Sequence, residues 1–316
     1  MSRYLLQRLL LVIPTLIGTS LIVFVLLRLL PGDVVDILFG GDPQVNQQTL
    51  DQIRESMGLN QPILVQYATW VGGLLRGDAG VSMRTGIPVG ESIARSLPVT
   101  VQLALMAIFF ACLFAIPLGV ISAVRRNGAT DFVARIVGLV GVSFPAFWLA
   151  TMFLLISSTI FRWVPPLKWV SPFEDFGQNM QIMLVPSLLL ALQPMAIIMR
   201  MTRASLLEVL RQDYIRTAYA KGLRERLVLA RHALQNAFIP VLTVIGVQFG
   251  VLLGGSVIIE QIFSLPGIAF FLLTGIYNRD YPVVQSTVLF LALIFILVNL
   301  VVDMLYGYVD PRIRYG

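Results

Sequence analysis

Residues 211–240 read RQDYIRTAYAKGLRERLVLARHALQNAFIP and form the longest polar interruption in the second half of an otherwise apolar chain. Apolar residues recur there at steps of three and four on either side of Gly222, which predicts two short amphipathic helices that meet at this glycine. The predicted apolar stripe consists of Leu207, Leu210, Tyr214 and Ala218 before the glycine and of Leu223, Leu227, Ala230 and Leu234 after it. Glycine enters the left-handed backbone conformation without a steric penalty, so it suits a bend between two helices. We call residues 211–235 the elbow.

The elbow is strongly basic, and its cationic residues lie off the apolar stripe or at its edges. They are Arg216, Lys221, Arg224, Arg226 and Arg231. Beside a membrane, such a segment is compatible with two roles. It can be a loop held to anionic headgroups, or it can be a docking element for a cytoplasmic partner.

The composition is that of a membrane protein. Of the 316 residues, 57% are hydrophobic and only 13% are charged, which excludes an ordinary soluble domain. A net charge of +6 would suggest nucleic-acid binding in a soluble protein, but in a membrane protein it reflects topology, and we expect no nucleic-acid partner. The single cysteine, Cys112, lies in an apolar run and allows no intrachain disulfide.

Six apolar segments are each long enough to cross a bilayer, which needs about 20 helical residues. They are residues 1–30, 99–123, 136–161, 183–201, 238–259 and 283–304. Arg3 and Arg8 before the first run also resemble the start of a signal peptide. That run is too long for one and no small-residue cleavage site follows, so we predict an uncleaved first transmembrane helix.

Residues 31–96 form a mixed segment that we predict to be extracytoplasmic. One short amphipathic helix is expected to stop at Gly58, and Pro62 is expected to open a second helix that carries Trp70. Apolar stripes with a tryptophan suit helices that lie on a membrane face. A small extracytoplasmic subdomain is the alternative.

The distribution of basic residues predicts the orientation. Segments 1–8, 124–135, 200–237 and 305–316 together hold 15 of the 23 Lys and Arg residues. Basic residues in short loops mark the cytoplasmic side. We therefore predict that both termini and the elbow are cytoplasmic.

Several residues inside the spans are candidates for packing or for a pathway. Gln102, Gln193 and Gln248 can form hydrogen bonds between helices or line a polar pathway. Our candidates for lining such a pathway are Ser143, Gln193 and Gln248. Gly246, Gly250 and Gly254 stand four apart and permit close packing, either within this chain or against a second membrane subunit. Prolines that can kink a span are Pro117, Pro145, Pro186, Pro194 and Pro240.

Motifs for chemistry are missing from the sequence. The only lysines, Lys168 and Lys221, are not part of a phosphate-binding GxxxxGK[ST] loop, and His232 has no second His or Cys with which to make a metal site. No GxSxG nucleophile motif occurs. We expect no catalytic residue, no metal site and no cofactor on this chain. If the protein does energised work, the energy must enter from elsewhere. A secondary transporter or channel is one alternative, although no Asp, Glu, His or Lys lies in the middle of a span, where ion-coupled transporters commonly place one. A scaffold protein is another.

Nine stretches, in order and over nearly the whole length, carry a family resemblance. They are RLLPGD (28–33), LNQPILVQY (59–67), LLRGDAGVSMRTGIPV (74–89), SFPAFW (143–148), TRASLLEVLRQDYIRTAYAKG (202–222), RHALQNAFIPVLT (231–243), ExIFSLPG (260–267), NRDYPVVQ (278–285) and DPRIR (310–314). The chain resembles the membrane permease subunits of binding-protein-dependent ABC importers, in the dipeptide/oligopeptide/nickel branch.

The family's defining EAA loop aligns with the elbow. Its pattern is Glu-Ala-Ala, three residues and Gly, and here Arg216-Thr217-Ala218 precedes Gly222, the form usual in the peptide branch. The downstream proline of the pattern is displaced to Pro240. The resemblance implies that the elbow couples the permease to an ATPase. The implied coupling residues are Asp213, Arg216, Thr217, Ala218, Lys221, Gly222, Leu223 and Glu225.

The resemblance implies an all-α polytopic protein of the type I ABC importer permease fold, a single transmembrane permease domain over residues 1–316 in a prokaryotic inner membrane. Within it, residues 97–308 form a five-helix core that includes the coupling loop 202–237, and residues 309–316 form a cytoplasmic tail. The implied partners are a second homologous permease subunit, two cytoplasmic ATPases that hold ATP and Mg, and a periplasmic or lipid-anchored substrate-binding protein. The implied cargo is a di- or oligopeptide, with nickel, glutathione or another small solute as the alternative.

Overall fold

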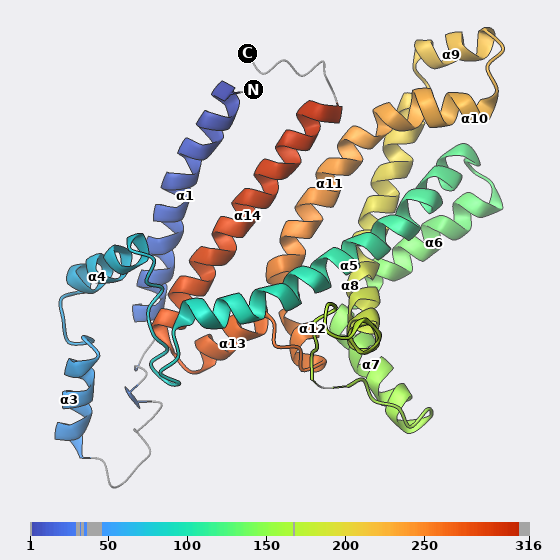
Figure 1. Ribbon diagram of the computed structural model, residues 1–316. Coiled ribbons are helices and arrows are strands. Elements are labelled where there is room, and N and C mark those ends of the chain that lie inside the picture. Colours follow the sequence, from blue (N-terminus) through green and yellow to red (C-terminus); the bar gives the residue numbers. More distant parts are fainter. Residues whose placement is uncertain (1, 30–31, 33–34, 37–45, 167, 310–316) are drawn as a thin grey trace. The chain divides into compact units, whose positions relative to one another are not determined.

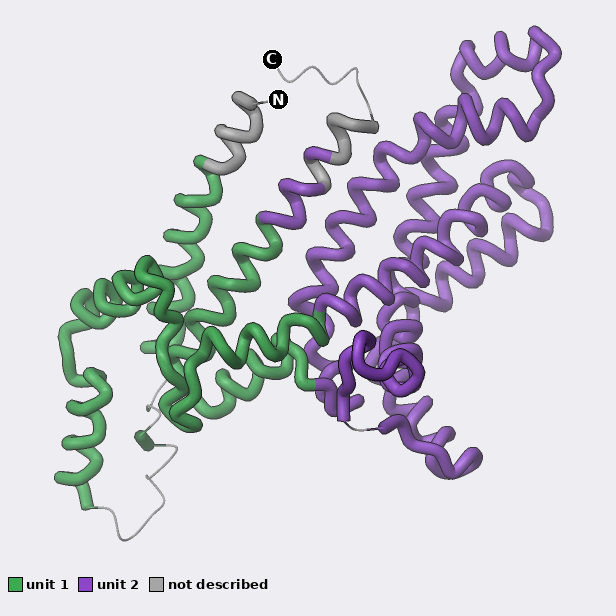
Figure 2. The backbone as a smooth tube through the Cα atoms, in the orientation of Figure 1, with its two compact units in different colours: residues 1–100, 266–296, 316 green, residues 101–265, 297–315 purple. Residues whose placement is uncertain are grey.

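The computed structural model describes residues 2–29, 32, 35–36, 46–166 and 168–309, and only the backbone of residues 2–9, 302, 303 and 305–309. Throughout these ranges the regular structure is helical (Figure 1), apart from an isolated β-bridge between Val81 and Pro88. The chain divides into two compact units (Figure 2). Unit 1 comprises residues 1–100, 266–296 and 316, and unit 2 comprises residues 101–265 and 297–315.

Five runs of helix in the described part are long and apolar enough to cross a membrane. Four of them lie in α1 (Ser2–Leu29), α5 (Val89–Val124), α8 (Phe176–Val209) and α14 (Tyr281–Val309). The fifth runs from Glu225 to Gly255 through α10 (Glu225–Leu227), the π-helix η1 (Val228–Ala233) and α11 (Leu234–Gly255). The predicted span 238–259 is corrected at its end, because a separate helix α12 (Val257–Ile262) follows Ser256.

The predicted span 136–161 is not one straight helix. It consists of α6 (Ala129–Ser143) and α7 (Ala146–Thr159), which meet at an angle of 89°. Phe144 between them is extended, with φ −98° and ψ 125°, because a following proline disfavours the helical conformation of the residue before it. Counted as one broken span, the pair completes the six predicted spans. The other prolines expected to kink spans, Pro117, Pro186, Pro194 and Pro240, lie inside helices that continue past them.

Unit 1 contains α1, α3 (Gln47–Ser56), α4 (Ile63–Leu75), α13 (Ile268–Tyr277), the start of α5 and most of α14. The predicted helix stop at Gly58 is confirmed by its φ of +68°, and Pro62 is the residue that precedes α4. The helix α5 begins at Val89, so the predicted extracytoplasmic segment 31–96 ends inside a helix rather than before one.

The buried carboxylate of Asp280 ties the turn before α14 to the loop before α5 in unit 1. Ser82 Oγ donates a hydrogen bond of 2.6 Å to Asp280 Oδ2. The backbone N–H groups of Met83 and Arg84 donate to the same carboxylate, at 3.2 and 3.4 Å. Two turns far apart in the sequence are thereby joined, beside an apolar core that contains Val89, Ile93, Ile268 and Val283.

In unit 2, α8 is the most buried of the spans and packs against α6, α7 and α11. A polar contact joins α5 to the start of α8: Asn179 Nδ2 donates to Gln102 Oε1 at 3.2 Å, and Gln102 Nε2 donates back to Asn179 Oδ1. Trp169 Nε1 also donates to Gln102 Oε1, at 3.3 Å. The interhelical hydrogen bond that we considered for Gln102 is thus confirmed.

Candidate functional site

The first arm of the elbow is the helix α9 (Asp213–Ala220), which is separated from α8 by a turn at residues 210–212. Of the predicted stripe, Leu207, Leu210 and Ala218 pack against one apolar core, although the turn interrupts the helix between them. The prediction is wrong for Tyr214. Within α9 the buried residues are Ile215 and Ala218, three positions apart on one face. The exposed fraction of the Tyr214 side chain is 44%.

The bend at Gly222 is a Schellman motif. Gly222 has φ +77°, its N–H donates to Tyr219 O at 2.9 Å, and the N–H of Leu223 donates to Ala218 O at 3.4 Å. A Cβ atom placed on Gly222 would meet no atom within 4 Å. Glycine is therefore required here by the backbone conformation and not by lack of space within this chain.

The second arm is wider than a regular helix. It begins with α10, continues as η1 and enters α11, and Leu234 N–H donates to Leu229 O, five residues back. The buried positions are Val228, Ala233 and Ala237, at steps of five and four. The predicted stripe through Leu227 and Ala230 is wrong, because the π-helix shifts the register by one residue and leaves both of them exposed.

An apolar core in unit 2 seats both arms on the ends of the long helices. Its buried members are Ala123 of α5, Leu206 of α8, Ile215 and Ala218 of α9, Val228 and Ala233 of η1, and Ala237 of α11. Burying a side chain such as that of Ile215 contributes about 1.5 to 3 kcal/mol. The partly buried Leu223, just after the bend, packs against the same core.

Polar contacts also hold the two arms together. Asn236 Nδ2 donates to Tyr214 Oη at 2.9 Å and to His232 O at 3.1 Å. The Tyr214 hydroxyl lies 3.4 Å from the same carbonyl oxygen and can donate to it. His232 takes part through its backbone carbonyl. The sequence offered no signal for this contact, because it depends on the register of the π-helix.

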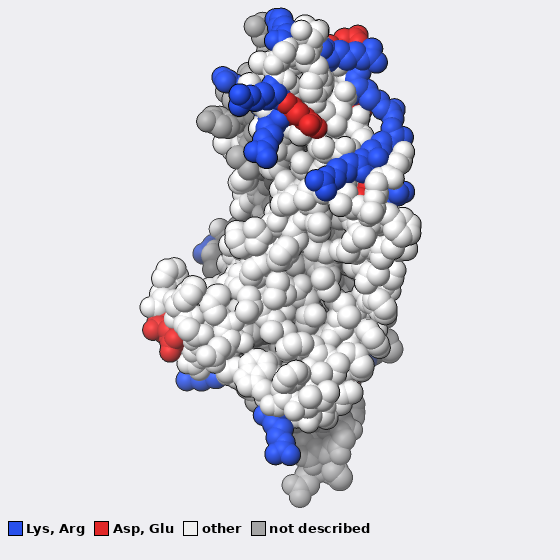
Figure 3. Space-filling view, turned by 90° about the vertical axis from the view of Figure 1, so that its right-hand side faces the viewer, with Lys and Arg blue, Asp and Glu red and all other residues white. Residues whose placement is uncertain are grey.

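The remaining face of the elbow is open to its surroundings. Of the eight predicted coupling residues, those with exposed side chains or backbone are Asp213, Arg216, Thr217, Lys221, Gly222 and Glu225. Ala218 is buried and Leu223 is half-buried, so these two support the elbow and do not form its surface. Figure 3 shows Lys and Arg side chains gathered over this end of unit 2. Tyr219 and Leu227, exposed by 44% and 43%, add apolar area to this face. Tyr219 was not among the predicted residues, and Leu227 was expected on the buried stripe.

A buried ion pair lies close to the elbow in unit 2. The carboxylate of Asp131, in the first turn of α6, is completely buried and accepts hydrogen bonds from Arg203 Nε at 2.9 Å and Arg203 Nη2 at 3.0 Å. Ser122 Oγ donates to it at 2.6 Å and the Asn127 N–H at 3.0 Å. Both residues lie in segments that the charge distribution assigned to the cytoplasmic side. Their pairing, across 72 positions, left no signal in the sequence.

The residues predicted for a pathway or for subunit packing are placed as follows. Ser143 ends α6 and is exposed, with Oγ donating to Leu139 O at 2.7 Å. Gln193 is exposed on α8 and Gln248 is partly buried on α11. Gly246 and Gly250 are buried, whereas Gly254 is exposed and has open space where a Cβ would be. The pathway role of the three polar residues and the packing role of the three glycines both stay predictions. Within the described ranges, no three His, Cys, Asp or Glu side chains are placed to hold a metal ion.

Comparison with known proteins relates the whole chain to one family. Residues 115–315 match the family model described as the inner membrane component of binding-protein-dependent transport systems, and residues 1–104 match the model of the N-terminal part of such membrane components. The dipeptide transport system permease protein DppB of Alkalihalophilus pseudofirmus is 42% identical over 335 residues, which cover 100% of both chains. DppB of Escherichia coli K12 is 40% identical over 338 residues, covering 100% of this chain and 99% of its own.

A solved structure agrees on the fold. A chain of the MetNI methionine ABC transporter, in an inward-facing conformation, superimposes with a TM-score of 0.56 and covers 69% of this chain and 96% of its own. Its sequence identity is 17%, so this likeness concerns the fold alone. The helical spans and the family models agree on a multi-pass inner membrane protein. The chain belongs to the family of inner membrane components of binding-protein-dependent transport systems.

Proposed function

We propose that this chain is one membrane subunit of an ATP-driven importer of di- or oligopeptides, and that its elbow docks onto a cytoplasmic ATPase. The observation that carries the proposal is the two-sided elbow. Its apolar face is buried on the ends of α5, α8 and α11, while its opposite face is exposed and charged. The names of both DppB relatives, which match over the full length, support a peptide as cargo.

The exposed face has the composition of a docking surface. Protein interfaces combine apolar or aromatic anchors with a polar rim. Tyr219 and Leu227 supply the anchors, and Asp213, Arg216 and Lys221 supply the rim. In this proposal the coupling is mechanical: ATP and Mg²⁺ bind to the ATPases, whose movement is passed to the elbow.

The other partners follow from the family. We propose a second homologous permease, two ATPase chains and an extracytoplasmic binding protein that delivers the cargo. Ser143, Gln193 and Gln248 are proposed to line the path. Of the glycine row, Gly246 and Gly250 are buried within this chain, so only its exposed end at Gly254 is proposed to pack against the second permease. The exposure of Gly254, with room around it, supports the use of this end of the row between subunits.

The decisive experiment changes Gly222 in two ways. Because a side chain there meets nothing in this chain, Gly222→Trp adds bulk to the docking surface, whereas the matched control Gly222→Asn adds a small residue that tolerates the left-handed conformation. An affinity-tagged full-length chain is purified from its host, and co-purifying ATPase chains are identified by mass spectrometry. We expect the ATPases with the wild type and Gly222→Asn, and their loss with Gly222→Trp. Because tryptophan also strains the left-handed backbone at this position, ATPase recovery is normalised to the amount of folded chain.

Uptake then tests the cargo. The purified complex is reconstituted in proteoliposomes, and uptake of radiolabelled glycylleucine is measured with and without ATP, in parallel with nickel and glutathione. ATP-dependent uptake of the dipeptide that is lost in Gly222→Trp supports the proposal. Uptake by the chain alone, without ATP and unaffected by Gly222→Trp, would overturn it. Uptake of nickel or glutathione in place of the dipeptide would agree with an ATP-driven importer and would contradict a peptide as its cargo.

A further inference from the structure

A polar pocket of about 380 Å³ lies entirely within unit 1. It is bounded by the last turn of α1, by the end of α3 and the turn that follows it, by α4, by the loop that precedes α5 and by the start of α14. The residues that matter for its chemistry are Arg28, Trp70, Asp78 and Gln285. None of them belongs to the elbow or to the predicted pathway.

Gln285 indicates that this pocket receives a ligand. The residue is part of the pocket lining and is only 3% exposed. Among the residues that the structure describes, nothing accepts a hydrogen bond from its Nε2 atom. A buried amide nitrogen carries two N–H donors and is costly to leave unpaired. A ligand with an acceptor oxygen would satisfy it.

Arg28 adds a positive charge that is fixed in place. Its Nε and Nη2 donate to Gln66 Oε1 at 3.2 and 2.7 Å, and Nη1 donates to Phe24 O at 3.2 Å. The guanidinium carbon also lies 3.4 Å from the centroid of the Phe24 ring. In the described part of the chain, no carboxylate forms an ion pair with Arg28. A guanidinium has five N–H donors, so two remain for an anion.

Asp78 places a negative charge in the same pocket. Its Oδ1 accepts a hydrogen bond of 2.8 Å from the Gly80 N–H, and the side chain is exposed. Within the described ranges Asp78 and Arg28 do not pair with each other. A pocket with two separate, opposite charges and an unpaired amide is complementary to a zwitterion that carries acceptor oxygens.

The position of the pocket relates it to the membrane surface. Arg28 lies at the end of the span Leu10–Leu29. The helix α4 packs Tyr67 and Trp70 against Phe24 of α1, with ring centroids 5.1 and 6.1 Å away, and it exposes Leu64 by 81% and Leu75 by 84%. An apolar helix with exposed leucines and a tryptophan is typical of the membrane interface. The pocket therefore opens at the level of the lipid headgroups.

A second pocket in unit 1, of about 400 Å³, is apolar. Consecutive residues divide between the two linings: Gly73 and Gln285 line the polar pocket, and Leu74 and Ser286 line the apolar one. The apolar pocket also reaches Leu16, which lies about 18 Å along α1 from Arg28 at 1.5 Å per residue. That depth corresponds to acyl chains rather than headgroups.

We propose that unit 1 holds one molecule of an aminophospholipid such as phosphatidylethanolamine. The phosphate pairs with Arg28, a phosphate or ester oxygen accepts from Gln285, and the primary ammonium is bound by Asp78. One acyl chain enters the apolar pocket. The primary ammonium has three N–H donors and the choline headgroup has none, so the site favours ethanolamine over choline.

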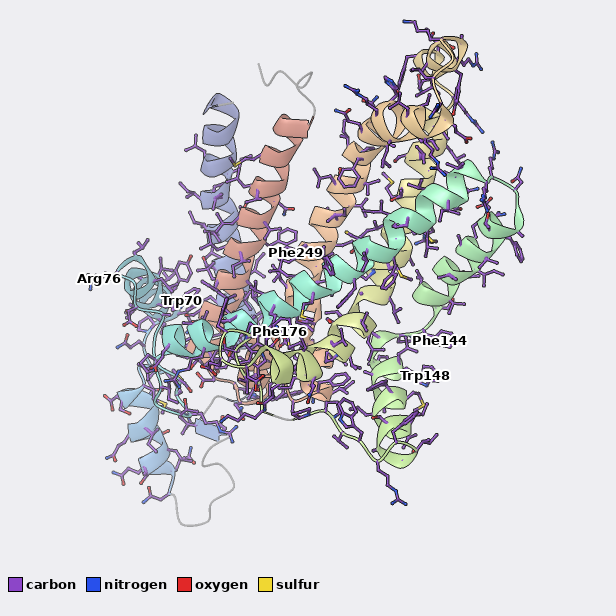
Figure 4. All side chains as sticks on the ribbon, turned by 45° about the vertical axis from the view of Figure 1, so that its right-hand side comes forward. Trp70, Arg76, Phe144, Trp148, Phe176 and Phe249 are labelled. Carbon is purple, nitrogen blue, oxygen red and sulfur yellow. The ribbon has the colours of Figure 1, made fainter. Side chains whose placement is uncertain are left out.

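The test uses native mass spectrometry of the full-length chain, delipidated in detergent and then offered equal amounts of phosphatidylethanolamine, phosphatidylcholine and phosphatidylglycerol. We expect one retained phosphatidylethanolamine per chain. Arg28→Gln and Gln285→Leu should each weaken its retention about tenfold or more. The control Arg76→Gln removes an exposed arginine outside both linings, at the end of α4 away from Trp70 (Figure 4), and should retain the lipid like the wild type.

Two further results keep the proposal falsifiable if a variant folds poorly. Asp78 is exposed, so Asp78→Asn should leave the fold intact. This variant should change the lipid preference from phosphatidylethanolamine towards phosphatidylglycerol. Gln285→Leu removes an unpaired amide, so the lipid-free protein should melt at the wild-type temperature or above while the lipid is lost. Equal retention of the three lipids, no loss in Arg28→Gln and Gln285→Leu, or displacement of the lipid by millimolar glycylleucine would each overturn the proposal.

Discussion

Arg203 donates one hydrogen bond to each carboxylate oxygen of Asp131, at 2.9 and 3.0 Å, and so joins α8 to the first turn of α6. The pair is asymmetric in its surroundings: the Asp131 side chain is fully buried, whereas that of Arg203 is 23% exposed. Ser122 on α5 completes the contact, so three helices meet at a single carboxylate.

Removing the charge of Asp131 should therefore be costly. We expect Asp131→Asn to destabilise the protein by about 3 to 5 kcal/mol, because a partly buried arginine loses its counter-charge. The matched control is Asp213→Asn, which breaks the exposed pair with Arg216 and should cost less than about 1 kcal/mol. Thermal unfolding in detergent, followed by tryptophan fluorescence, measures both. Equal melting temperatures for the two variants would contradict this prediction.

The Asp280 carboxylate allows a similar prediction for unit 1. Asparagine in its place would direct an N–H₂ group towards Ser82 Oγ or the backbone N–H groups of Met83 and Arg84. We expect Asp280→Asn to cost about 2 to 4 kcal/mol and to make the loop 76–88 more sensitive to limited proteolysis. Glu91→Gln, in an exposed pair with Arg95, is the control and should leave the cleavage rate unchanged.

Because η1 is a π-helix, we predict opposite outcomes for two single-residue deletions. Deletion of the exposed Ala230 shortens the step from Val228 to Ala233 from five residues to four, which a regular α-helix accommodates on one face. Deletion of the exposed Val251 turns the following residues of α11 by about 100° and moves Leu252 and Leu253 out of their buried positions. We expect monodisperse protein on size-exclusion chromatography for the first deletion and aggregation for the second. If both aggregate, the π-helix is not a single inserted residue.

Because Tyr219 is exposed, its substitution should affect docking of the ATPase without affecting the stability of the fold. Tyr219→Ala should change the free energy of unfolding by no more than about 0.5 kcal/mol, since surface substitutions are usually this mild. The same change should lower ATPase co-purification several-fold, because truncation of an aromatic anchor commonly costs about 2 kcal/mol of binding. Ile215→Ala, on the buried face of α9, is expected to do the reverse and lower the melting temperature. Full ATPase recovery with Tyr219→Ala would remove this residue from the interface.

Local features of the fold could be predicted from the sequence where one residue type determines them. Gly222 marks the bend, Gly58 ends α3 and Pro62 precedes α4, because backbone conformation decides each of these. The register of the second arm could not be predicted in this way. The π-helix changes the helical period, and periodicity was the only signal available for residues 228–237.

Contacts between residues far apart in the sequence also could not be predicted. Neither the pairing of Asp131 with Arg203 nor that of Asp280 with Ser82 has a local pattern, because each depends on which turns the helices bring together. At Pro145 the sequence indicated a possible kink. The size of the 89° bend depends on the extended Phe144 and on the packing of α6 and α7 against α8.

Four of the seven buried residues beneath the elbow are alanines, Ala123, Ala218, Ala233 and Ala237. An alanine has no side-chain torsion that can adjust, and a close-packed interior leaves little free volume for sliding. This contact is therefore stiff, whereas one built from methionines or long aliphatic chains would be compliant. If a partner pushes on the outer face of α9, we expect the ends of α5, α8 and α11 to move together with it.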